Sequence, residues 1–245
     1  MTFNELNYLR GEDYQLNDTI RIKHPTLQEI INYDEENYLN AINLFCLKPY
    51  DLMVELDDMG VDFRKMNDFD LFMQLIQIPM YQEAVKFFIG ECNFQVCINP
   101  ENDEMLLEDI FAEIRIDRYI YGKIAEFIRG INFISDKREF NLENDMALEF
   151  VMEEERATRN RRKNMPKKPF ESVLANTISF FCWNNLSGYN IENVWNLKVY
   201  QFYNGLHRIH KTDNYKNTML GVYTGNVDSS KIQMDEINWS GKIKL

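Results

Sequence analysis

The sequence has few cysteines and no spacing that would pair them. Cys46, Cys92, Cys97 and Cys182 are spread over 245 residues without a C-x-x-C pair. A disulfide framework needs a dense and regular set of cysteines, so it is excluded as the feature that organises the fold. We expect free and mostly buried thiols in a reducing cytoplasm.

Long apolar runs are also missing. No uninterrupted apolar stretch approaches the roughly 20 residues that a membrane-spanning helix needs. Residues 1–5 show neither the basic nor the apolar region of a secretory leader. Hydrophobic residues still make up 45% of the chain, which is ample for a packed core. These features predict a folded, soluble protein without membrane contact.

Positive charge is scarce, with 27 Lys and Arg against 39 Asp and Glu and a formal net charge of -12. Such an acidic chain is a poor general ligand for nucleic acid or anionic membranes. The exception is a basic segment over residues 159–168, which could contact an acidic partner or nucleic acid. The simpler interpretation is favourable charge at a helix C-terminus, with pairing to Glu153, Glu154 and Glu155 upstream. The six basic residues are Arg159, Arg161, Arg162, Lys163, Lys167 and Lys168.

Catalytic signatures are absent as well. The chain has no Walker-type loop, no G-x-G-x-x-G and no G-x-S-x-G. His207 and His210 have an i, i+3 spacing that can hold a metal, but no neighbouring cysteine or carboxylate completes a ligand set. We therefore expect no enzyme, no catalytic residue, no metal and no cofactor. The alternative is a metal-dependent or nucleic-acid-processing enzyme that uses this histidine pair and the basic segment.

The periodicity predicts a mostly α fold with one or two small β-hairpins. Alternating apolar residues place one hairpin over residues 14–23 and a second over residues 94–107. We divide the chain into an N-terminal α-rich module over residues 1–130 and a C-terminal helical module over residues 141–245, with the basic linker around 159–168. The N-terminal helices are expected to begin at Pro25, Asp34, Pro49, Asn67 or Asp68, Pro79 and Asp117.

Three consecutive helices are predicted near the C-terminus, over residues 169–184, 196–211 and 213–223. Lys211 suits the C-terminal dipole of the second helix, and Asp213 can cap the third. The first helix carries one apolar stripe that we assign to the core. Its residues are Val173, Leu174, Thr177, Ile178, Phe181 and Cys182.

This C-terminal part is rich in Trp and Tyr, which fill helical cores by default but are also enriched at interfaces. The run Val194–Tyr203 (VWNLKVYQFY), followed by Leu220–Asp228 (LGVYTGNVD), resembles the C-terminal part of the tail assembly chaperones of long-tailed, siphovirus-like bacteriophages. In that family a W-x-L-T-x-Y-Q-F helix precedes a G-x-Y-x-G segment. Lys198 departs from the pattern, because Thr or Ser is expected at its position.

The resemblance implies a protein in the cytoplasm of the bacterial host that binds the tape measure protein, keeps it soluble and helps recruit tail tube subunits without catalysis. Self-association is possible, and a nucleic-acid partner is not expected. A structural tail component retained in the virion is a further alternative. The residues expected to face the partner are Trp195, Tyr200, Tyr203, Leu206 and Tyr223.

Overall fold

A computed structural model describes residues 4–99, 104–136, 145–166, 168–184, 186 and 188–243. Within these residues the chain is 59% helical, with 11 α-helices and two small antiparallel sheets, which confirms the predicted fold class. The α-helices are α1 (Glu5–Arg10), α2 (Leu27–Tyr33), α3 (Glu35–Cys46), α4 (Met53–Asp58), α5 (Asp68–Leu75), α6 (Pro79–Ile89), α7 (Arg118–Ile131), α8 (Asp145–Lys163), α9 (Val173–Trp183), α10 (Val199–Tyr223) and α11 (Met234–Ile237).

Both predicted hairpins are present. Strand β1 (Tyr14–Gln15) pairs with β2 (Arg21–Ile22), with Tyr14 opposite Ile22. Strand β3 (Gln95–Ile98) pairs with β4 (Met105–Asp109), and residues 100–103 of the predicted hairpin lie outside the described residues. The short strand β5 (Ile114–Ile116) adds to β4 and was not predicted. The second sheet therefore has three strands, in the order β3-β4-β5.

Local capping explains where most helices begin. Asn67 caps α5 and Asp117 caps α7 through bonds to the backbone three residues on, as predicted. Pro79 is the first residue of α6, also as predicted. The prediction that a helix begins at Pro25 is wrong, because Thr26 caps α2 and forms a reciprocal capping box with Glu29.

The body of the molecule is built on aromatic packing between α3, α5, α6 and α7. Phe45 of α3 packs against Phe72 of α5 and Phe88 of α6, with ring centroids 5.6 and 5.9 Å apart. Tyr121 of α7 closes the cluster at 4.7 Å from Phe72. The same core includes residues of α9 and α10, so one hydrophobic cluster joins parts of the two predicted modules.

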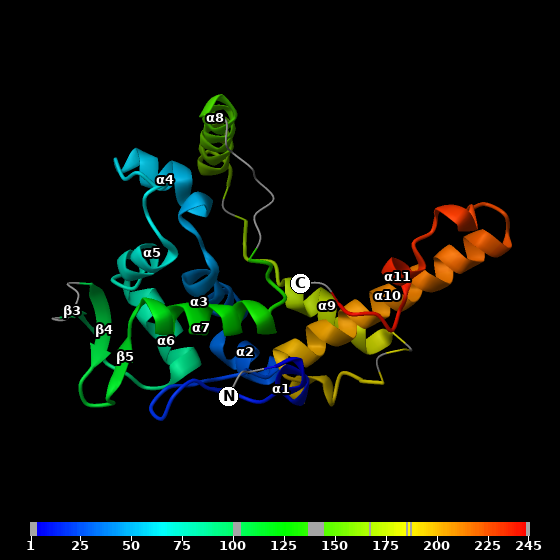
Figure 1. The fold of residues 1–245 in the computed structure, drawn as a ribbon, viewed down its shortest axis with the longest axis horizontal. Helices are drawn as coiled ribbons and strands as arrows, with labels where there is room; N and C mark the ends of the chain where they lie inside the picture. Colours follow the sequence, from blue (N-terminus) through cyan, green and yellow to red (C-terminus); the bar gives the residue numbers. More distant parts are fainter. Residues whose placement is uncertain are drawn as a thin grey trace.

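Helices α4 and α8 form a second, smaller packing unit that stands away from the body (Figure 1). The α8 residues Leu148 and Met152 are buried there against Val54, Leu56 and Phe63. Helix α8 continues through Lys163, so the first half of the expected basic linker is helical. The first residues of the predicted C-terminal module, 141–144, lie outside the described residues.

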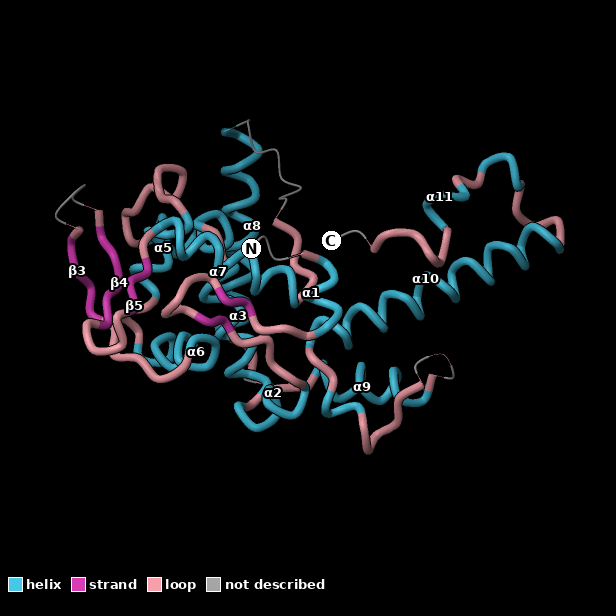
Figure 2. The backbone as a smooth tube through the Cα atoms, turned by 60° about the horizontal axis from the view of Figure 1, so that its bottom comes forward, coloured by secondary structure: helices cyan, strands magenta, loops and turns pink. Residues whose placement is uncertain are grey.

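Helix α10 leaves the body as a long arm, and the C-terminal segment with α11 folds back along it (Figures 1 and 2). The expected break between residues 211 and 213 is wrong, because α10 is one helix of 25 residues. The 3-10 helix η2 (Val194–Asn196) precedes it, and α10 begins after the N-cap Lys198 instead of at the predicted residue 196. The returning segment holds the arm, since Lys211 Nζ donates to the carbonyl oxygens of Asn238 and Lys242 at 3.4 and 3.1 Å.

Candidate partner-binding surface

Helix α9 is fixed to the body at its N-terminus by a carboxylate from another helix. Glu35, in the first turn of α3, accepts hydrogen bonds from the backbone N–H groups of Val173 and Leu174, each at 3.0 Å. The hydroxyl of Ser172, the N-cap residue, donates to the same carboxylate. An anion at a helix N-terminus satisfies free N–H groups and favours the helix dipole. The start and direction of α9 are therefore set by α3.

One side of α9 packs on α10 at close range. Leu174, Ile178 and Phe181 are buried, and the Phe181 ring meets Phe202 edge-on at 5.1 Å. Gly205 of α10 makes room for this ring, because a Cβ atom at position 205 would lie 2.8 Å from a Phe181 ring carbon. The contact between the two helices depends on a residue without a side chain.

The opposite side of α9 exposes large apolar side chains to solvent, together with the polar Asn176 and Ser179. Helix α9 contains no charged residue, and eight of its 11 residues are apolar. Val173 and Trp183 are 67% and 82% exposed, and Phe180 is exposed between them. Their spacing of seven and three residues places them on one face. We call Val173, Phe180 and Trp183 the outer stripe of α9.

The outer stripe corrects part of the sequence interpretation. The predicted core stripe does supply the buried residues Leu174, Ile178 and Phe181, but Val173 lies on the solvent side. Phe180 and Trp183 were not singled out for a site. The available signal was a helix of 11 residues without a charged side chain, which leaves few residues suited to an exposed side. The described chain covers only one side of this helix.

The base of α10 is held by the N-terminal segment. The Leu27 N–H donates to the Leu197 carbonyl at 2.9 Å, and the Val199 N–H donates to the Pro25 carbonyl at 3.0 Å. The buried His24 accepts the Tyr200 N–H at its Nε2 atom, at 3.2 Å. Burial, followed by the nearby Lys198, lowers the pKa of His24 to about 4. His24 is therefore neutral and able to accept this bond near pH 7.

The predicted partner-facing residues do not form one surface. Tyr200 is only 5% exposed and stacks on Tyr8 and Phe133, with centroids 5.1 and 4.8 Å apart, so we correct it to a core residue. Trp195, Tyr203 and Leu206 are half-buried against the core. Tyr223 is 80% exposed at the end of the arm, 20 residues or about 30 Å beyond Tyr203.

The basic residues are also dispersed. Arg159 pairs with Asp58 and Glu55 of α4 at 2.8 and 3.4 Å, instead of with the expected glutamates upstream. Arg161, Arg162 and Lys163 are exposed in the last turn of α8, where their charge suits the helix dipole. Lys168 is exposed beyond the helix, and Lys167 lies outside the described residues.

The two histidines of α10 make separate aromatic contacts. The His207 ring lies 4.8 Å from Phe133, and the His210 ring lies 5.7 Å from Phe180 of the outer stripe. Burial, then the proximity of His210, lowers the pKa of His207. Across the described ranges, no group of three or more His, Cys, Asp or Glu side chains is arranged to hold a metal ion.

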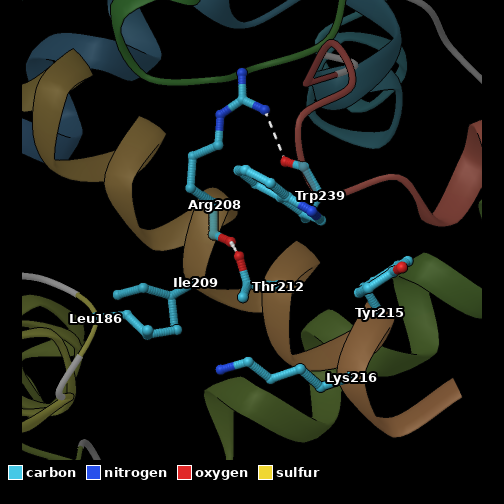
Figure 3. Close-up of a pocket in the computed structure, with 7 residues that line it drawn as sticks. All are labelled: Leu186, Arg208, Ile209, Thr212, Tyr215, Lys216 and Trp239. Atoms are coloured by element: carbon cyan, nitrogen blue, oxygen red, sulfur yellow. Dashed lines mark hydrogen bonds between the residues drawn. The ribbon is translucent and has the colours of Figure 1, made fainter. Parts of the chain in front are cut away.

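A second open surface lies where the C-terminal segment returns along α10. It is a pocket of about 600 Å³ that we call the α10 slot. Arg208 Nη1 donates to the Trp239 and Gly241 carbonyl oxygens at 3.1 and 2.6 Å, which fixes Trp239 as one wall (Figure 3). The slot is lined by Leu186, Arg208, Ile209, Thr212, Tyr215, Lys216 and Trp239.

The comparisons with known proteins concern this C-terminal part. None of the described helices is both long and apolar enough to cross a membrane. No curated protein and no solved structure matches the chain. Residues 164–244, about a third of the chain, match the model of the family described as YomV second domain, which is phage-derived. The segment that carries α9, α10 and the slot is therefore similar to a phage-related domain.

Proposed function

We propose that this protein is a non-catalytic tail assembly chaperone of a long-tailed bacteriophage. It binds the tape measure protein, keeps that protein soluble and helps to recruit tail tube subunits. The observation that carries the proposal is the outer stripe of α9, three exposed large apolar side chains on a helix without charged residues. The similarity of residues 164–244 to a phage-derived domain supports the phage setting. The resemblance of Val194–Tyr203 and Leu220–Asp228 to tail assembly chaperones supports the specific role.

The outer stripe suits a helical partner. A long amphipathic helix in water gains stability when its apolar side is laid against another apolar face, through side chains spaced by three and four residues. Val173, Phe180 and Trp183 offer such a face over about three turns of α9. Burying one large apolar side chain is worth about 1.5–3 kcal/mol, so three give a useful but reversible contact.

The rest of the molecule suits the task of a carrier. A chain with a net charge of -12 repels its own copies at long range and remains dispersed while it holds an apolar segment. Glu35 and Gly205 fix α9 on the body, so the stripe is presented on a rigid element. Preorganised surfaces lose less conformational entropy when they bind.

The test is co-expression with the tape measure protein of the same phage, followed by size-exclusion chromatography of the soluble fraction. Co-elution is expected, together with aggregation of the tape measure protein when it is expressed alone. The double variant Phe180→Ser/Trp183→Ser is expected to fold but to lose the partner, because the substitutions lie on the solvent side of α9. The matched control is Phe111→Ser, which removes an aromatic ring that is 98% exposed next to β4.

Two results would count against this proposal. If both proteins are soluble when expressed separately and never co-elute, the chaperone role is wrong. If the double variant binds the tape measure protein as well as Phe111→Ser does, the chaperone role stands but the outer stripe of α9 is not the binding surface. Circular dichroism of each variant separates loss of binding from loss of folding.

A further inference from the structure

Strand β3 is an edge of the three-stranded sheet, and no other strand of the described residues pairs with its outer side. The strand order is β3-β4-β5. Both views place β3 at the outer margin of the molecule, with β4 between it and β5 (Figures 1 and 2). An open strand edge presents a row of backbone N–H and C=O groups that can pair with another strand.

The ladder between β3 and β4 shows which backbone groups face outward. The Asn99 N–H donates to the Glu104 carbonyl at 2.8 Å, so these two residues form a hydrogen-bonded pair. Hydrogen-bonded and non-hydrogen-bonded pairs alternate along antiparallel strands. Cys97 is therefore bonded to β4, whereas Val96 and Ile98 direct their backbone groups away from β4. The side chains of Val96 and Ile98 are 49% and 67% exposed.

The β3 edge lacks the features that usually keep an exposed edge from pairing. Natural edges are protected by charged residues, proline or bulges. Residues 93–99 contain no charged residue and no proline, in a chain of which 27% is charged, and β3 pairs with β4 residue for residue. The opposite edge, β5, carries Arg115 and leads through Asp117 into α7. In this acidic chain, the β3 edge is a place where two copies can meet without like charges facing each other.

We propose that β3 of one copy of this protein pairs antiparallel with β3 of a second copy, so that two three-stranded sheets become one continuous sheet. The two-fold axis passes beside Cys97. Val96 of each copy then lies opposite Ile98 of the other, and each such pair exchanges both backbone hydrogen bonds. This register uses every outward-facing backbone group of Gln95–Ile98. The same surface is used on both copies, so association closes at a dimer.

Cys97 reports on this register. At the centre of the dimer the two Cys97 residues form a non-hydrogen-bonded pair, with Cα atoms about 4.5 Å apart. That separation lies within the roughly 4.4–6.8 Å that a disulfide spans. A register shifted by two residues would instead place each Cys97 opposite Gln95. The Cys97 side chain is partly exposed and its thiol is free in the single chain.

The first test is sedimentation velocity of the full chain without any partner, from low to high concentration. The wild-type protein is expected to form a dimer and nothing larger. Added salt strengthens the dimer, because it screens the repulsion between two chains of charge -12. Ile98→Lys places a charge on the edge and is expected to weaken association by about tenfold or more. Ile110→Lys is the matched control, since Ile110 is 72% exposed just after β4.

The second test traps the dimer with diamide, which takes up two electrons and two protons as two thiols become one disulfide. A crosslinked dimer is expected for the wild type and for Cys182→Ser, but not for Cys97→Ser. It is also expected to be lost in Ile98→Lys, which keeps the thiol, and to be kept in Ile110→Lys. Circular dichroism of each variant shows that it is folded.

Three results would overturn the proposal. These are a wild-type protein that stays monomeric at the highest concentration in added salt, a dimer that Ile98→Lys weakens no more than Ile110→Lys does, and a dimer that diamide does not trap through Cys97. None of these outcomes depends on tape measure binding, so they are independent of the proposed function.

Discussion

Helices α7 and α9 are both rich in apolar residues, but only α7 has a charged side to turn toward water. Helix α7 buries Tyr121, Phe127 and Ile128 and carries Lys123 and Glu126 on its exposed face, where they form an ion pair at 2.8 Å. Helix α9 buries a comparable side and exposes Val173 and Trp183 on the other. The difference shows that the fold covers the apolar side of α7, whereas α9 retains apolar surface that a partner can cover.

Among the tests of this difference between α7 and α9, the largest expected effect is on the free energy of unfolding. Phe127→Ala in α7 should cost about 3–5 kcal/mol of unfolding free energy, because Phe127 is fully buried and its loss leaves a cavity. Trp183→Ala in α9 should change stability by no more than about 0.5 kcal/mol, because its side chain is solvated. Urea denaturation followed by circular dichroism measures both. Equal losses would mean that Trp183 is packed in solution and that the outer stripe is not free.

A second effect concerns the attachment of α10 to the body through His24. The pKa of His24 is about 4 in the folded chain, against a usual value of 6.5. The unfolded chain therefore binds a proton more readily, so the His24 contribution is fully present above pH 6.5 and is lost as pH falls toward 4. The full difference corresponds to about 3 kcal/mol. The groups that act on this pKa include Lys198 and Asp13.

The measurement is the unfolding free energy at pH 7 and pH 4.5 for the wild type and for His24→Gln, which cannot titrate. The wild type is expected to lose more stability than the variant over this interval. Because the carboxylates are common to both proteins, their contribution cancels in the difference. If the two proteins lose the same amount, His24 does not carry this pH dependence.

A smaller effect sharpens the contrast between α7 and α9 through two glycines, one in α7 itself and one in α10 where it packs against α9. Gly205→Ala in α10 should destabilise the fold by about 1–3 kcal/mol, because the new Cβ would lie 2.8 Å from the Phe181 ring. Gly122→Ala in α7 should stabilise it by about 0.5–1 kcal/mol, since nothing lies within 4 Å of the added atom and alanine favours a helix. Thermal unfolding compares them directly. A gain at both positions would show that α9 can shift away from α10 without cost.

Much of the fold could be predicted from the sequence because the signals are local. Asn67, Pro79 and Asp117 mark helix starts through bonds or backbone angles set within three residues. The predicted helix end after Lys211 is wrong because no residue there interrupts a helix. Thr212 bonds back to the Arg208 carbonyl at 2.8 Å and the chain continues. Strand β5 was missed because three residues give too short an alternation.

The candidate site was less predictable because burial there depends on distant segments. Tyr200 looked like a surface residue on its own helix, yet Tyr8 and Phe133 cover it from other parts of the chain. Val173 was assigned to the core stripe, yet the structure leaves it 67% exposed. Only the assembled structure shows which apolar residues lack neighbours.

The most direct test of the central claim is site-specific photo-crosslinking in cells that co-express the tape measure protein. A photoreactive phenylalanine analogue is placed at position 183, in the outer stripe of α9, or at position 111, beside β4. The account predicts a strong crosslink to the tape measure protein from position 183 and little or none from position 111. Equal crosslinking from both positions, or crosslinking from position 111 alone, would contradict the claim that α9 carries the binding surface.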